Sequence, residues 1–150
     1  MNDAYIMLVE DREDDIELTL RSFKRAQITS DIVVKRDGVE ALEFIVGLMG
    51  SCGEATGKPP DLILLDVSMP RMNGIEFLEK LRALDHTRYV PVVMHTTSSE
   101  ERDLVASYDR GANSYLRKPT SPAESASIAS LIGRYWIGAN KIAGSRPSCT

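Results

Sequence analysis

The sequence has little of what defines several large classes of protein. Its 150 residues include two cysteines, Cys52 and Cys149, and neither belongs to a Cys-x-x-Cys motif or a Cys/His cluster. We therefore expect no zinc site and no disulfide framework. No apolar run approaches the roughly 18 residues that cross a membrane, and the amino end lacks a basic stretch followed by a long apolar core. We expect a cytoplasmic protein with no membrane partner and no secretory signal.

An excess of positive charge is also missing. The chain has 18 Lys and Arg residues against 22 Asp and Glu residues, a net charge of −4 at pH 7, so no nucleic-acid partner is expected. The content of 43% hydrophobic and 27% charged residues is typical of a globular protein. The length predicts one domain, which we place at residues 1–142, followed by a flexible tail at 143–150.

Short apolar runs alternate with helical patterns along the whole chain. Continuous apolar runs are typical of strands that are buried on both faces of a parallel sheet. Apolar residues that recur every three or four positions predict amphipathic helices between these runs. We expect strands at 5–9, 32–34, 62–65, 90–94 and 114–118, and helices around 16–23, 39–45, 75–82, 104–108 and 128–135. This order favours an α/β fold with a doubly wound parallel sheet.

Polar side chains stand where four of the predicted strands end. In a doubly wound sheet this edge binds ligands. Crowded carboxylates repel one another unless a cation is present, and oxygen ligands without histidine or thiolate suit Mg²⁺. A carboxylate beside Mg²⁺ can attack a phosphoryl group, which an ammonium and a hydroxyl can then bind. For any one of these residues a helix cap is the simpler interpretation, but for all five together it is weaker. They are Glu10, Asp11, Asp66, Thr96 and Lys118.

Four motifs in the same order resemble response-regulator receiver domains. They are the acidic pair Glu10-Asp11, the segment Leu62–Gly74 around Asp66, the strand 92–97 that ends in Thr96-Thr97, and the segment Gly111–Pro119 with its Lys-Pro pair. The resemblance covers about residues 5–140. It implies a flavodoxin-like receiver fold with five parallel strands in the order 2-1-3-4-5.

The resemblance also implies a role for each site residue. Asp66 is the phosphoacceptor. Mg²⁺ is held by Asp11 directly, by Glu10 through water, by Asp66 itself and by the backbone carbonyl of Ser68.

The remaining roles concern the phosphoryl group and its partner. Thr96 and Lys118 bind the phosphoryl group, and Tyr115 is the aromatic switch residue. The donor is a sensor histidine kinase, and the protein is a signalling switch and not a turnover enzyme. The long insertion Gly47–Pro60 and the pair Tyr135-Trp136 resemble single-domain regulators that partner phytochrome-type kinases.

Other functions remain open at this point. A chemotaxis or phosphorelay receiver would carry the same motifs. A non-phosphorylated adaptor would keep the fold but lose the acids or Lys118, and all of these are present. A hydrolase that forms an aspartyl phosphate would usually have a second acid two residues after the nucleophile, where this chain has Ser68.

The last helix has more apolar residues than one face of a sheet needs. We expect its core stripe to be Ile128, Leu131, Ile132 and Tyr135, with a second stripe of Ala129, Ile132 and Trp136. The resembling subfamily dimerises through its carboxyl-terminal helix. We therefore predict a homodimer whose interface includes Ile132 and Trp136; the alternative is that Trp136 packs onto its own domain.

Three further positions have structural interpretations. We expect His86 to be a solvated loop residue and His95 to pack against a neighbouring helix. The charged run Arg12–Asp15 is most simply the start of a helix, where acidic side chains are favourable.

Overall fold

The computed structural model describes residues 4–49 and 57–143. Cys52, Cys149, the middle of the predicted 47–60 insertion and the predicted tail from residue 144 lie outside the described residues. Within the described ranges, no helix is long and apolar enough to cross a membrane.

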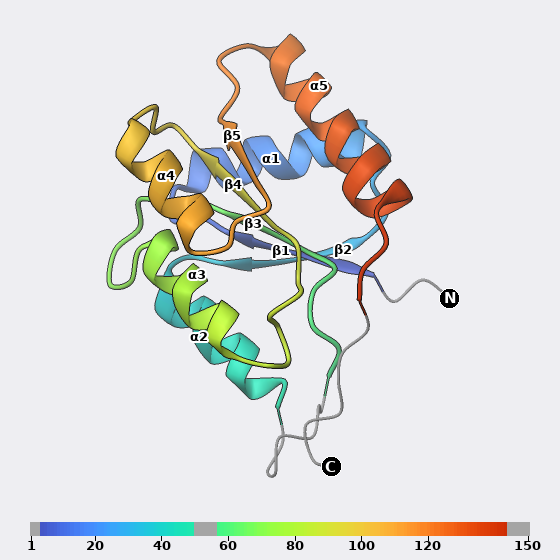
Figure 1. Cartoon of the computed structure of the whole chain (residues 1–150). Coiled ribbons are helices and arrows are strands. Elements are labelled where there is room, and N and C mark those ends of the chain that lie inside the picture. The colour runs from blue at the N-terminus through green and yellow to red at the C-terminus, as the bar shows by residue number, and fades with distance from the viewer. Residues whose placement is uncertain (1–3, 50–56, 144–150) are drawn as a thin grey trace.

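Five parallel strands form one sheet in the order β2-β1-β3-β4-β5 (Figure 1). They are β1 (Tyr5–Val9), β2 (Asp31–Lys35), β3 (Leu62–Leu65), β4 (Val92–Thr96) and β5 (Ser114–Arg117). In the register, Val9 of β1 pairs with Leu65 of β3, so the two strands end side by side. The predicted fold class and strand order are therefore confirmed.

Helices cover both faces of this sheet (Figure 1). They are α1 (Glu13–Arg25), α2 (Gly38–Gly47), α3 (Gly74–Ala83), α4 (Glu101–Asp109) and α5 (Pro122–Leu131), which continues as a π-helical segment, η2 (Ile132–Ala139). The helices α1 and α5 pack on one face, and α2 and α3 pack on the other. The helix α4 lies against α3 and β5.

Local sequence signals set where the helices begin. Asn73 and Glu76 form a capping box at the start of α3, so two otherwise unpaired backbone N–H groups are satisfied. Ser121 caps α5, and Pro122 occupies its first turn, where a missing N–H is harmless. These caps fix the loops that follow β3 and β5, which carry the polar edge of the sheet.

The central strands form the core, as their apolar runs predict. All four residues of β3 are fully buried, and alternate residues of β1 point to opposite faces. Met7 and Val9 pack toward α2 and α3, whereas Ile6 and Leu8 pack toward α1 and α5. Because both faces are covered, the functional chemistry is confined to the ends of the strands.

The predicted core stripe of the last helix is wrong at two of its four positions, whereas Ile128 and Ile132 do pack on the core. Leu131 and Tyr135 are 60% and 53% exposed, whereas Ala129 and Ile132 are 1% exposed. Trp136 is partly buried against the core between the sheet and α1. The segment η2 is a π-helix, in which hydrogen bonds run from residue i to i+5. Leu131, however, lies in α5 before this wider turn. Ala129, Ile132 and Trp136 all pack on the core, so the second predicted stripe faces the sheet and the first does so only in part.

The two predicted interface residues differ in burial. Ile132 lies inside its own domain, whereas Trp136 is partly buried against its own core and keeps an exposed part, so its place in an interface stays a prediction. The homodimer itself stays a prediction, and the exposed side chains on this helix are Leu131 and Tyr135.

The prediction for His86 is also wrong, because this residue is 5% exposed. The loop after α3 folds against Arg82, whose guanidinium donates hydrogen bonds to the carbonyls of Thr87, Arg88, Val90 and Gly111. This concentration of backbone contacts draws the loop inward and buries the imidazole.

Candidate functional site

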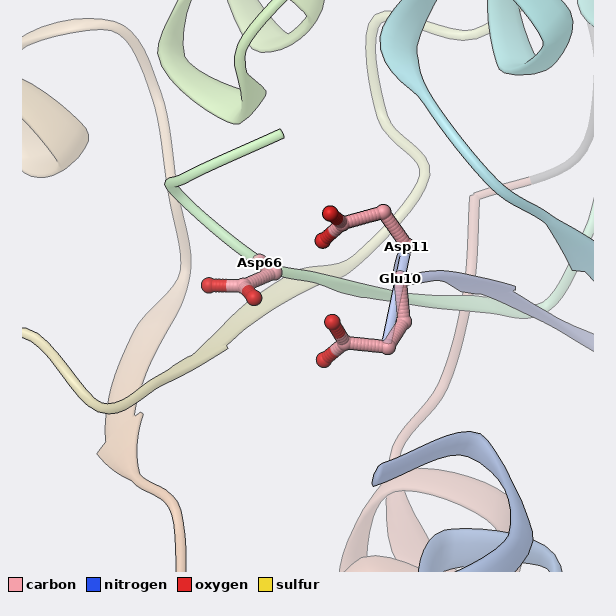
Figure 2. A group of neighbouring side chains, drawn as sticks. All are labelled: Glu10, Asp11 and Asp66. Carbon is pink, nitrogen blue, oxygen red and sulfur yellow. The ribbon is translucent and has the colours of Figure 1, made fainter. Parts of the chain in front are cut away.

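Three carboxylates meet at the carboxyl ends of β1 and β3. Glu10 and Asp11 directly follow β1, and Asp66 directly follows β3. Figure 2 shows the three side chains around a common space, and one oxygen of each lies within 4.8 Å of the others. Glu10 and Asp66 are 2% and 5% exposed, whereas Asp11 is open to solvent. The pairing of adjacent parallel strands is what brings residues 10 and 66 together.

The loop after Asp66 turns back sharply over the end of the strand. The amide of Gly74 donates a hydrogen bond to the carbonyl of Val67 at 2.9 Å. A Cβ atom at Gly74 would lie 2.0 Å from the carbonyl oxygen of Asp66, so only glycine fits. Ser68 is exposed in this loop, and its amide donates to Asp66 Oδ1 at 3.4 Å. The loop thus returns to the carboxylate from which it starts.

The ammonium group of Lys118 lies among the carboxylates. Its Nζ contacts Asp66 Oδ2 at 3.0 Å, Asp15 Oδ2 at 2.9 Å and the carboxylate of Glu10. The side chain is 6% exposed. Burial alone would lower the pKa of Lys118, but the three carboxylates outweigh it and raise that pKa. Lys118 therefore carries its charge at neutral pH.

Burial has the largest effect on the pKa of Glu10. Burial raises the pKa of Glu10 to about 7, and the charge of Asp66 adds to this rise. Lys118 and the amide of Arg12 oppose it but do not cancel it. Because a bound cation favours the charged form of a carboxylate, binding of a metal ion at this cluster would be coupled to loss of a proton from Glu10.

The donor set fits a hard divalent cation. All three side chains of the cluster offer oxygen, and no histidine or cysteine belongs to it within the described residues. Oxygen ligands of this kind suit Mg²⁺ or Mn²⁺. Glu10, Asp11 and Asp66 are the side chains that would hold the ion, as the sequence predicts, whereas the proposed contribution of the Ser68 carbonyl stays a prediction.

Thr96 and Tyr115, the two remaining predicted residues, both form hydrogen bonds with Ser98 in the loop after β4. Thr96 is 1% exposed, and its Oγ1 accepts a hydrogen bond from the amide of Ser98 at 3.2 Å. The hydroxyl of Tyr115, on β5, donates to the carbonyl of Ser98 at 3.1 Å. The hydroxyl of Ser98 donates to Asp103 of α4 at 2.6 Å. This loop therefore connects the predicted phosphoryl-binding hydroxyl to the predicted switch aromatic.

His95 lies in β4 next to Thr96, close to the charges of Lys118, Asp66 and Asp15. With Asp15, Leu18 and Lys118 it lines a cavity of about 30 Å³ between α1 and α5. It is 8% exposed, and its Nε2 atom has no hydrogen-bond partner in the described part of the chain. Burial lowers the pKa of His95 to about 4, and the charge of Lys118 adds to this effect. The expectation that this histidine packs against a helix is confirmed.

Sequence reasoning missed two contributors. The charged run Arg12–Asp15 does begin α1, as predicted, and Asp15 in its first turn also contacts Lys118. Its position four residues after Asp11, one helical turn beyond the strand end, was a usable signal.

The second contributor is the ion pair between Arg71 and Asp37, which holds the loop after Asp66 in place. Arg71 adopts a left-handed backbone with φ of 67° and donates from Nε and Nη2 to the carboxylate of Asp37 at 2.9 and 3.2 Å. Asp37 caps α2, and the amide of Gly38 donates to the carbonyl of Met72 at 3.1 Å. No periodicity marks this contact, because it depends on the path of the loop.

A parallel sheet with an acidic cluster, a buried lysine and a threonine at adjacent strand ends defines a receiver-type domain. The family model "Response regulator receiver domain" matches residues 6–129. The chain therefore belongs to the response regulator receiver domain family.

Individual relatives of the chain give a more specific comparison within this family. The chain is 33% identical over 133 residues to the response regulator Rcp1 of Synechocystis, covering 88% of each protein. It is 35% identical over 140 residues to a probable methanogenesis regulatory protein, FilR2, of Methanothrix harundinacea, covering 93% of this chain and 87% of that protein.

Solved structures agree with the sequence relatives. The structure of the phosphorylated cyanobacterial phytochrome response regulator RcpA aligns with a TM-score of 0.82 at 30% identity. The Mn²⁺-bound form of Rcp1 aligns with a TM-score of 0.79 at 30% identity. Each alignment covers 94% of this chain and 99% of the other. The protein is thus a receiver-domain response regulator related to phytochrome response regulators.

Proposed function

We propose that this protein accepts a phosphoryl group on Asp66 from a sensor histidine kinase, in a step that requires Mg²⁺. The observation that carries the proposal is the environment of the Asp66 carboxylate. One oxygen contacts Lys118 at 3.0 Å, the other accepts from the amide of Ser68 at 3.4 Å, and two further acids complete a cation site. A single nucleophile is thus placed beside groups that can bind a phosphoryl dianion.

The chemistry divides among the residues of the site. When bound, Mg²⁺ supplies positive charge that offsets the repulsion between the carboxylates and the phosphoryl oxygens. A carboxylate oxygen of Asp66 forms a bond to phosphorus as the bond from phosphorus to the donor histidine nitrogen breaks, and that nitrogen keeps the electron pair. Lys118 donates to a phosphoryl oxygen, and the Thr96 hydroxyl donates to another. The product is an acyl phosphate whose charge these two donors stabilise.

The hydroxyl of Thr96 is also the start of the proposed response. As it turns toward the phosphoryl group, its contact with the Ser98 amide is lost. Ser98 also holds the hydroxyl of Tyr115, so the change reaches β5 and α4. The protein then signals through protein contacts as a two-state switch, without turnover.

We further propose a phytochrome-type kinase as the donor. The support is the likeness to Rcp1 and to the phytochrome response regulator RcpA, over nearly the whole of both proteins. The chemistry at Asp66 would be the same with another histidine kinase, so the identity of the donor is tested separately from the site.

The phosphoacceptor is tested by labelling with a small acyl phosphate and Mg²⁺. Asp66→Asn keeps the shape of the side chain but removes the nucleophile, so we expect covalent phosphate, measured by intact mass, to vanish. Asp85→Asn is the matched control, because Asp85 is 77% exposed in the loop after α3 and its ion-pair partner is Arg88, which is outside the acidic cluster. Labelling of Asp66→Asn at the wild-type level would show that the phosphoacceptor is another residue.

A further inference from the structure

We propose that Asp15 is a positioning residue that holds Lys118 throughout phosphorylation. The inference rests on the proposed function and adds to the site a fourth carboxylate that does not belong to the candidate metal cluster. Asp15 lies in the first turn of α1, and its Oδ2 atom contacts Lys118 Nζ at 2.9 Å. The Asp15 side chain is 25% exposed and that of Lys118 is 6% exposed, so the contact lies mostly out of water.

The hydrogen-bonding capacity of Lys118 makes Asp15 distinct from its other partners. An ammonium group has three N–H donors, and here they face three carboxylates, those of Glu10, Asp15 and Asp66. To bind a phosphoryl oxygen, Lys118 must exchange one of these contacts. The identity of the contact it keeps determines where the ammonium lies when the phosphoryl group arrives.

Two of the three partners have other roles in the reaction. Glu10 and Asp66 belong to the cluster that would hold the cation, so their oxygens are shared with it. Asp66 also loses its carboxylate charge when it becomes an acyl phosphate. Asp15 is outside that cluster and is not consumed by the chemistry. Asp15 is therefore the one partner that can keep the same contact before and after transfer.

The contact between Asp15 and Lys118 also has an electrostatic role. A divalent cation at Glu10, Asp11 and Asp66 would repel the ammonium of Lys118, because both positive charges would lie close together beside the same carboxylates. The carboxylate of Asp15 offsets this repulsion from the side of α1. Arg12 Nε lies 3.5 Å from Asp15 Oδ2 on the solvent side and helps to hold the carboxylate in this position.

Asp14 provides a matched control for this proposal. It lies in the same first turn of α1 and has the same interaction with the helix dipole. Its side chain is 75% exposed, and it contacts Arg12 and the amide of Asp15 but not Lys118. If Asp15 merely favours the start of the helix, Asp15→Asn and Asp14→Asn will behave alike.

The experiment compares these two variants at saturating Mg²⁺ with a small acyl phosphate as donor. For Asp15→Asn we expect the phosphorylation rate to fall by roughly tenfold, the effect of one charge-assisted hydrogen bond. Asp14→Asn should stay close to wild type. Mg²⁺ affinity, measured without a phosphodonor, should change by less than about threefold in both variants, because neither residue is a candidate ligand. Asp15→Glu should restore part of the rate, because it returns the charge.

A second readout follows the Lys118 side chain directly by NMR in the presence of Mg²⁺ alone. We expect the Lys118 Nζ resonance to shift and its protons to exchange faster in Asp15→Asn, and to remain unchanged in Asp14→Asn. Equal rates and equal Lys118 resonances in the two variants would overturn the proposal. If wild type takes up no phosphate, the proposed function fails, but the NMR comparison still decides whether Asp15 holds Lys118.

Discussion

Two buried side chains beside the site titrate in opposite senses, and we predict that their effects on stability cancel in the wild type. Burial raises the pKa of Glu10 from 4.5 to about 7 and lowers the pKa of His95 from 6.5 to about 4. Glu10 binds more protons in the folded than in the unfolded chain, so its contribution to the free energy of unfolding falls as pH rises from 4.5 to 7. His95 binds fewer protons when folded, so its contribution rises between pH 4 and 6.5.

The two effects have similar size. Each pKa differs by about 2.5 units from its value in the unfolded chain, which corresponds to about 3 kcal/mol over the full range at 1.36 kcal/mol per unit. Between about pH 5 and 6.5, each group changes the free energy of unfolding by about 2 kcal/mol, in opposite directions. Wild-type stability should therefore be nearly flat in this interval when no metal is bound.

Single substitutions separate the two contributions. In Glu10→Gln only the His95 effect remains, so the free energy of unfolding should rise by about 2 kcal/mol from pH 5 to 6.5. In His95→Leu only the Glu10 effect remains, so the free energy of unfolding should fall by a similar amount over the same interval. The assay is urea unfolding with EDTA, monitored by Trp136, the one tryptophan of the chain, which packs against the core.

The control is Glu17→Gln, an exposed acid on α1, which should keep the flat profile. The charged groups that face His95 are Asp15 from α1, Asp66 from β3 and Lys118 from the end of β5, and all are retained in these variants. If Glu10→Gln and His95→Leu both show the wild-type profile, the two groups do not titrate as their burial implies, and the reasoning is refuted.

Two further predictions concern the loop after Asp66 and the last helix. Arg71→Ala removes both hydrogen bonds to Asp37 that hold the loop after Asp66. It should weaken Mg²⁺ binding in calorimetry, by less than the roughly tenfold lost when a residue bonded directly to a metal ligand is removed. Arg110→Ala, which breaks an exposed pair with Glu79, should leave the affinity unchanged. For the proposed homodimer, Leu131→Ser with Tyr135→Ser should shift sedimentation toward monomer, whereas Leu18→Ser on α1 should not. A monomeric wild type at high concentration contradicts the dimer.

Much of the fold could be predicted from the sequence because its strands are buried on both faces. A run such as Leu62–Leu65 is readily assigned to the middle of a sheet, because it is apolar throughout. Its pairing with β1 follows from the strand order that the receiver resemblance implies. The ends of β1 and β3 then determine where Glu10 and Asp66 lie side by side. The acids were predictable because their positions depend only on the sheet.

The contacts that sequence reasoning missed depend on side-chain reach or on the path of a loop. Asp15 reaches Lys118 across 103 residues of sequence, and this requires the spacing between α1 and β5 to be known. Arg71 reaches Asp37 only because its own backbone is left-handed. His86 is buried because Arg82 donates hydrogen bonds to backbone carbonyls of the loop that contains His86. No hydrophobic pattern in the sequence indicates these contacts.

The π-helical segment η2 allows the last helix to change in length without changing its packing. In an α-helix each residue advances the face by about 100°, so removing one residue turns every later side chain away from its partner. A π-turn differs, because hydrogen bonds from residue i to i+5 accommodate one residue more than an α-turn does. Loss of one residue within 133–135 would therefore restore the i to i+4 pattern, and Trp136 would keep its place against the core. The segment can shorten by one residue while the side chains that cover this face of the sheet stay the same.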